Sequence, residues 1–243
     1  MFKPVEKKSL ADAVFEQLRD QIVSGEMEPG SALPAERALC EMLDVNRGAV
    51  REALKKLEQA RLVSIQHGGA TRVLDFRETA GTDLLADLLL TADGEVNTSV
   101  ARGVMEMRSA LGQDIARRCA MRSPELASEL DQICEAMEAA GDDFEELAEL
   151  DFAFWERIVE GSHNVAYELA FNSIRHMYDQ LAGLLIPVLS VELEDCAAHR
   201  KIADAIRASD ADQAEFYARD LFGRGERRID QLAGLFDAAK EKR

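Results

Sequence analysis

The chain has 243 residues, 47% of them hydrophobic and 31% charged, and a net charge of −17 at pH 7. This length allows one large or two ordinary domains, and the composition is typical of a folded globular protein rather than a disordered or collagen-like one. The acidic balance argues against a protein whose whole surface binds nucleic acid or an anionic membrane.

The negative charge is distributed unevenly along the chain. Residues 1–75 carry 11 basic and 12 acidic side chains, whereas residues 76–243 carry 18 and 34. We therefore expect two domains with different partners, the first near neutral and able to approach a polyanion, the second strongly acidic and solvated.

Targeting segments and paired cysteines are not indicated. The N-terminus lacks the apolar run of a signal peptide and no later stretch is long enough to span a bilayer, so we expect a cytoplasmic protein with no membrane partner. The cysteines lie far apart without C-x-x-C pairing, which favours reduced, mostly buried thiols. They are Cys40, Cys119, Cys134 and Cys196.

The first 75 residues predict three helices and a β-hairpin. Apolar residues at helical spacing indicate a helix over 9–25, a short second helix that starts within 33–37, and a third over 46–59. The stretches 62–66 and 70–74 then alternate with a period of two around a glycine-rich turn. Three helices followed by a hairpin form a winged helix-turn-helix.

From about residue 80 onward the pattern is helical almost throughout. Apolar residues recur at spacings of three and four in seven segments, and breaks are expected near Pro187, among other places. The segments are 81–92, 98–121, 124–139, 143–160, 163–185, 190–208 and 211–239. We predict a mainly α fold class, with an antiparallel bundle of six or seven helices after the winged domain.

The run LPAERALCEMLDVNRGAVREALKKLEQARLVSIQHGGATRV, residues 33–73, resembles the DNA-binding domain of the GntR superfamily of regulators. IQHG and FRETAG resemble the FadR subfamily, and most closely its fatty-acid-responsive namesake; the helical remainder is similar to the subfamily's FCD effector domain. The resemblance implies a DNA-binding domain over 1–75, a linker over 76–82, and a ligand-binding and dimerisation domain over 83–243.

Two arginines at the start of the third helix are candidates for reading DNA. Arg47 and Arg51 lie one turn apart, and a guanidinium pairs bidentately with the O6 and N7 atoms of guanine in the major groove. Asn46 and Gly48 are candidates for contacts to the DNA backbone at close approach. Outside this motif, two arginines at this spacing are usually only a solvated helix face.

The resemblance adds three residues to this interface. It implies that Arg37 faces bases or phosphates in the major groove together with the two arginines of the third helix. It also implies that His67 and Gly68 enter the minor groove at the tip of the wing. Without the resemblance, His67 reads equally well as a turn residue.

FCD domains often hold a divalent metal through an Asp-x-x-x-His pair and two later histidines. Here Asp151 is present, but Trp155 occupies the histidine position; His199 matches the next histidine, and Asp220 with Leu221 stands where the last is expected. A structural or catalytic metal needs three or four placed donors. We therefore expect no metal or other cofactor, with Asp151, His199 and Asp220 as an incomplete set.

The resemblance also implies a set of effector-binding residues in the bundle. Arg108 and Tyr178 fall at positions similar to cavity residues of the fatty-acid-responsive regulators, and Gly225 lies in a segment like their late ligand helix. The full expected set is Arg108, Asp151, Trp155, Tyr178, His199 and Gly225. Two alternatives stay open: Arg108 neutralises a core carboxylate such as Asp151, and Trp155 is only part of the core.

The leading hypothesis is a ligand-responsive transcriptional regulator that binds a palindromic double-stranded DNA operator as a homodimer. Its effector would be a small acidic molecule, either a long-chain acyl-coenzyme A or a small organic acid. We do not expect an enzyme, because no nucleophile elbow, phosphate-binding glycine loop or complete metal motif occurs. A bundle that serves only for dimerisation is a third hypothesis.

Overall fold

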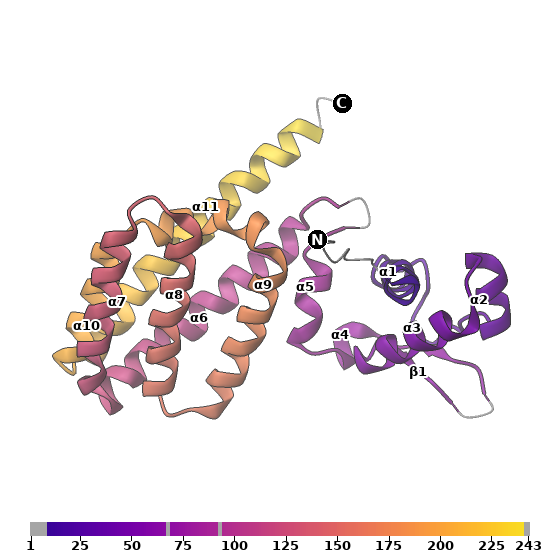
Figure 1. Cartoon of the computed structure of the whole chain (residues 1–243), viewed down its shortest axis with the longest axis horizontal. Coiled ribbons are helices and arrows are strands. Elements are labelled where there is room, and N and C mark those ends of the chain that lie inside the picture. The colour runs from indigo at the N-terminus through magenta and orange to yellow at the C-terminus, as the bar shows by residue number, and fades with distance from the viewer. Residues whose placement is uncertain (1–8, 67–68, 92–93, 241–243) are drawn as a thin grey trace, which may run out of the picture. The chain divides into compact units, whose positions relative to one another are not determined.

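A computed structural model describes residues 9–66, 69–91 and 94–240, with side chains described as far as residue 234. The chain divides into two compact units, Met1–Val96 (unit 1) and Asn97–Arg243 (unit 2). Both consist mainly of helices, with one short sheet in unit 1 (Figure 1). The predicted mainly α fold class is confirmed. No helix in the described ranges combines the length and apolarity needed to cross a bilayer.

Unit 1 starts with three helices whose ends follow from local capping. They are α1 (Leu10–Val23), α2 (Glu36–Leu43) and α3 (Arg47–Gln59). Ser9 and Asp12 form a capping box at the start of α1, and the Asn46 side chain accepts a hydrogen bond of 2.9 Å from the Ala49 amide at the start of α3. Asp44, in the left-handed conformation (φ 51°), ends α2 and allows the tight turn into α3.

The wing follows α3 as an antiparallel pair, β1 (Val63–Ser64) and β2 (Arg72–Val73). Val63 pairs with Val73, and both side chains are buried in the core of unit 1. The strands are shorter than the predicted 62–66 and 70–74, although Ile65, just past β1, still packs against the core of unit 1. His67 and Gly68 lie outside the described residues.

The segment predicted as a linker packs onto unit 1. It forms α4 (Phe76–Thr79), a 3₁₀ turn at Thr82–Leu84 and the one-turn helix α5 (Leu85–Leu88). Phe76, Ala80, Leu84 and Leu88 recur every four residues and pack against the apolar core of the winged domain. The boundary between the compact units therefore falls at residue 96 rather than within 76–82, because this apolar stripe is buried by the first unit.

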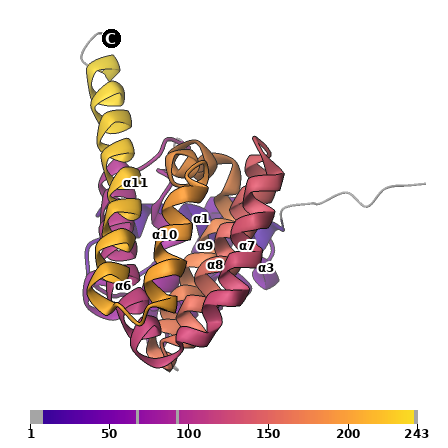
Figure 2. The ribbon, with the colours of Figure 1, turned by 90° about the vertical axis from the view of Figure 1, so that its left-hand side faces the viewer.

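Unit 2 is a bundle of six helices within the described residues, in agreement with the prediction (Figure 2). They are α6 (Thr98–Arg122), α7 (Ala127–Ala140, after a 3₁₀ turn at Pro124–Leu126), α8 (Phe144–Gly161), α9 (Val165–Leu193), α10 (Cys196–Arg207) and α11 (Ala211–Lys240). The C-terminal half of α11 extends beyond the other helices of the unit (Figure 2). Cys119 and Cys134 are buried in this bundle, whereas Cys196, like Cys40 in unit 1, is only half-buried.

The predicted break near Pro187 is wrong. Helix α9 continues through the proline to Leu193 and is instead distorted at Leu181, where φ is −128° and ψ is 17°. A proline removes the hydrogen bond to the carbonyl four residues earlier, here Gly183, and crowds that carbonyl. The irregular turn thus lies just before the position that the proline disturbs, which lets the helix continue.

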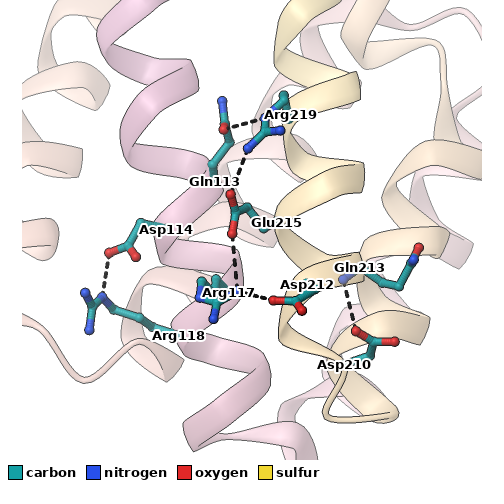
Figure 3. Close-up of polar contacts among 9 residues, drawn as sticks. All are labelled: Gln113, Asp114, Arg117, Arg118, Asp210, Asp212, Gln213, Glu215 and Arg219. Carbon is teal, nitrogen blue, oxygen red and sulfur yellow. Dashed lines mark hydrogen bonds and ion pairs between the residues drawn. The ribbon is translucent and has the colours of Figure 1, made fainter.

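Polar contacts join α6 to α11 along one edge of the bundle (Figure 3). Arg219 donates to Gln113 at 2.8 Å and to Glu215 at 2.7 Å, and Arg117 contacts both Glu215 and Asp212. These side chains are largely exposed, so each contact contributes little to stability. The two long helices are held chiefly by the apolar core beneath this edge.

Candidate functional site

The first turns of α3 present the predicted DNA-reading residues to solvent. Asn46, Arg47, Gly48 and Arg51 are all exposed, and within the described residues no hydrogen bond or ion pair engages Arg47. The side-chain oxygen of Asn46, Oδ1, accepts the capping hydrogen bond of α3, which leaves the side-chain NH₂ group for an outside partner. The local fold therefore places two guanidinium groups and a close-approach glycine at the start of one helix.

The N-terminus of α2 lies beside this surface. Glu36 accepts a hydrogen bond from the Arg51 Nε atom at 2.9 Å, which ties α2 to α3. Arg37, the next residue, is 81% exposed and its Nε atom donates to Glu41 at 3.0 Å. The structure thus places Arg37 next in the chain to Glu36, which contacts the α3 cluster, and both paired arginines are bonded through Nε.

A cavity inside unit 2 contains three of the six predicted effector residues. Its free volume is about 40 Å³, and Arg108, Asp151 and Trp155 lie on its wall. The rest of the wall is mostly apolar. It includes Leu111, Ile115, Phe152, Val159, Phe171 and Phe222. Such a wall offers apolar contacts and one cation, the chemistry that suits a ligand with an apolar body and one acidic group, and the cavity must widen to admit it.

Arg108 forms a buried ion pair with Glu192 on α9. The distance from Nη2 to Oε2 is 3.1 Å, and the two side chains are 12% and 2% exposed. The second carboxylate oxygen of Glu192, Oε1, is buried without a hydrogen-bond partner. Burial raises the pKa of Glu192 to about 7, against the opposing charge of Arg108.

Arg108 does neutralise a core carboxylate, but that carboxylate is Glu192 rather than Asp151. Glu192 is not among the residues predicted from the sequence. One signal was present: Glu192 lies three and four residues after Leu189 and Val188, on the apolar face that buries both. An acid on such a face needs a buried partner.

Asp151 and His199 contact each other. The His199 Nε2 atom lies 2.8 Å from Asp151 Oδ1, and Nδ1 lies 3.0 Å from the Asp195 carbonyl oxygen. Burial alone lowers the pKa of the fully buried His199, but the hydrogen bond and charge of Asp151, the Asp195 carbonyl and the charge of Glu192 together outweigh it, so the pKa lies above its usual value. Asp151 and His199, two members of the incomplete metal set, are therefore hydrogen-bonded to each other.

Asp220 does not join them. It is exposed on α11 and pairs with Arg224 at 3.1 Å. Across the described ranges, no group of three or more His, Cys, Asp or Glu side chains is arranged to hold a metal ion. Asp220 thus fails to complete the metal set, because its partner is an arginine one turn further along its own helix.

Aromatic rings hold the polar end of the cavity. Trp155 stacks on Phe222 with ring centroids 4.5 Å apart, and the Arg108 guanidinium lies over the same ring, 5.1 Å from its centroid. Tyr178 is buried behind the wall, 4.7 Å from the Phe152 ring. Tyr178 therefore supports a lining residue rather than facing the cavity itself.

Gly225 touches the buried ion pair. A Cβ atom at this position would lie 1.9 Å from Glu192 Oε1 and 2.3 Å from the Met105 methyl group. Only glycine fits there while Glu192 keeps its place. All six predicted effector residues thus lie on the cavity wall or in contact with the buried side chains beside it, and Glu192 is the unpredicted addition.

Comparison with known families identifies a domain in each unit. Residues 10–73 match the bacterial regulatory proteins of the gntR family, and residues 103–224 match the FCD domain. The chain belongs to the GntR family. Its FCD domain and its relatives make it a transcriptional regulator rather than an enzyme. The family match in unit 1 ends with β2, before the residues that pack α4 and α5 onto that unit.

Relatives cover most of the chain. The HTH-type transcriptional regulator Mce2R of Mycobacterium tuberculosis is 38% identical over 221 residues, 90% of this chain and 91% of that protein. A fatty acid metabolism regulator protein of Cronobacter sakazakii is 30% identical over 177 residues, covering 73% and 72%. Among solved structures, the Listeria monocytogenes regulator Lar has a similar fold, with a TM-score of 0.59 and 16% identity over 94% of this chain and 100% of that one.

Proposed function

We propose that this regulator binds a palindromic operator as a homodimer and that a small acidic effector in the cavity of unit 2 modulates that binding. The leading effector is a long-chain acyl-coenzyme A, and a small organic acid is the second candidate. Allostery in this proposal is a difference in effector affinity between two dimer geometries, which the effector shifts.

The observation that carries the proposal is a cavity with mostly apolar walls and one guanidinium. Arg108 lies at its polar end, and the aromatic and aliphatic wall is suited to a hydrocarbon chain. One relative is named a fatty acid metabolism regulator, which supports the acyl thioester over the small acid. A small acid would leave most of the apolar wall without contacts.

Fluorescence anisotropy tests the proposal. Purified protein is titrated onto DNA from upstream of its own gene and of fatty-acid degradation genes, with and without oleoyl-coenzyme A. Specific binding that the thioester abolishes supports the proposal. Specific binding unaffected by the thioester removes the acyl effector and leaves small acids to be screened. An operator affinity that no ligand changes overturns the effector function of the cavity.

The DNA surface is tested by one substitution. Arg47→Ala should remove roughly 1–3 kcal/mol of specific binding, the range for one bidentate base contact, with little change in stability. Arg157→Ala removes the same charge from α8 of unit 2, where the side chain pairs with Glu160, and should leave operator affinity unchanged. Wild-type operator affinity in the Arg47 variant would refute its role.

A further inference from the structure

Arg108, which lies on the cavity wall, is already paired with a carboxylate, that of Glu192. Glu192 comes from α9 and reaches the Arg108 guanidinium on α6 in the absence of any ligand. Its side chain is almost fully buried, so water does not compensate the second oxygen, which has no partner. Burial of this unpaired oxygen costs free energy in the ligand-free protein.

We propose that Glu192 is an internal substitute for the acidic group of the effector, holding Arg108 until that group displaces it. The inference rests on the proposed function of the cavity and adds its regulation. In the free state the charge of Arg108 is neutralised from within the protein. An incoming acid must compete with Glu192 for the guanidinium, so the apparent affinity reflects the fraction of molecules in which Glu192 has left.

The charges around the pair support competition rather than simple addition. Facing Glu192 are Arg108 from α6, Asp151 from α8 and His199 from α10. Asp151 and His199 are already bonded to each other, and the acidic partner of Arg108 is Glu192. A second carboxylate placed beside an ionised Glu192 would meet like charge in a low-dielectric interior, which is strongly unfavourable.

The surroundings of Glu192 provide a way to release it. Gly225 on α11 leaves room for Glu192 Oε1, because it has no side chain. Burial favours the neutral form of Glu192 and Arg108 opposes it, so a side chain displaced from Arg108 can stay buried as the neutral acid.

Trp155 reports directly on this site. It is the only tryptophan of the chain and lies on the cavity wall, stacked on the Phe222 ring that Arg108 also covers. The test titrates decanoate at pH 8 into the full-length wild type and Glu192→Gln, following tryptophan emission. The uncharged 1-decanol serves as the probe without an acidic group. Glutamine keeps the shape and a hydrogen-bond acceptor, so the variant should fold.

Glu192→Gln should bind decanoate at least tenfold more tightly than wild type, with less than a twofold change for 1-decanol. Gly225→Ala, whose methyl group forces Glu192 from its position, should change decanoate affinity in the same direction. Glu194→Gln, an exposed acid just past the end of α9, is the matched control and should bind as wild type does.

Equal or weaker decanoate binding by Glu192→Gln would overturn the inference, and so would no binding by either protein. A gain of the same size for 1-decanol would also overturn it, because the gain would then come from the apolar wall. Failure of the proposed function is distinguishable, since it appears in the separate DNA assay as an operator affinity that ligands do not change.

Discussion

Two arginine–glutamate pairs of this protein have nearly the same geometry in opposite surroundings. Arg51 and Glu36 in unit 1 lie 2.9 Å apart and their side chains are 65% and 41% exposed. Arg108 and Glu192 in unit 2 lie 3.1 Å apart and are 12% and 2% exposed. Water screens the exposed pair, so that pair breaks and forms easily. The buried pair is screened much less, and neither side chain has water to replace its partner.

This difference matches the roles proposed for the two units. An exposed arginine pair can rearrange at little cost when a phosphate or base approaches. A residue that senses an effector must respond to one ligand and to nothing else in solution. Burial supplies that selectivity because each charge inside the bundle requires a defined partner.

The largest effect should follow from removing one half of the buried pair. Arg108→Ala removes the counter-charge of Glu192, so at pH 8 the buried acid must take up a proton or stay charged without a partner, and we expect a loss of about 3–5 kcal/mol in the free energy of unfolding. The pKa of Glu192 is raised to about 7, so its favourable contribution is present at low pH and lost as the pH rises through 7. The loss in the variant should therefore shrink at pH 5.5.

Urea unfolding at the two pH values measures this change. Arg200→Ala is the control, because Arg200 pairs with Glu138 at 2.8 Å but both side chains are substantially exposed. The control should lose less than about 1 kcal/mol at either pH. If Arg108→Ala were no more destabilising than Arg200→Ala, the two environments would not differ in the way described.

A smaller effect is expected from crowding the ring beneath the buried pair. Gly112 on α6 faces Phe222, and a Cβ atom there would lie 2.1 Å from the ring. Gly112→Ala should displace Phe222, and with it Trp155 and Arg108, at a cost of about 1–3 kcal/mol. A shift in Trp155 emission should accompany the loss.

Gly103 provides the matched control on the same helix. It is exposed, and a methyl group added there would have no neighbouring atom within 4 Å, so Gly103→Ala should stabilise the helix by about 0.5–1 kcal/mol. Equal effects of the two substitutions would mean that helix propensity, rather than contact with Phe222, determines the result.

The sequence was sufficient for the long helices of both units because their apolar periodicity is long and regular. The helix predicted over 81–92 is wrong, since the chain there forms only a 3₁₀ turn at Thr82–Leu84 and the one-turn α5. The sequence placed the unit boundary too early, since the stripe from Phe76 to Leu88 has the same period whether it forms part of a linker or packs on a domain. It also misjudged Pro187, because a proline stops a helix only when neighbouring turns have no room to distort.

The candidate site was predictable in its members but not in its pairing. Resemblance pointed to Arg108 and Asp151, and both line the cavity. Periodicity does not say which acid on a neighbouring helix meets a given arginine, because that depends on the rotation and offset of α6 and α9. Glu192 therefore became visible only when the helices were placed together.

The smallest effect should follow from neutralising the exposed acid. Glu36→Gln should change the free energy of unfolding by less than about 0.5 kcal/mol, because the pair with Arg51 is exposed. Glutamine still accepts from Nε, so Arg51 keeps its orientation and both terminal NH₂ groups for DNA. Loss of one negative charge near the phosphates should tighten DNA binding by about 0.5 kcal/mol, roughly twofold, at low salt. The gain should fade as salt is added. Glu145→Gln, an exposed acid at the start of α8, is the control for urea unfolding and anisotropy. A stability loss above about 1 kcal/mol in Glu36→Gln would show that the exposed pair is structural, and the contrast between the two pairs would fail.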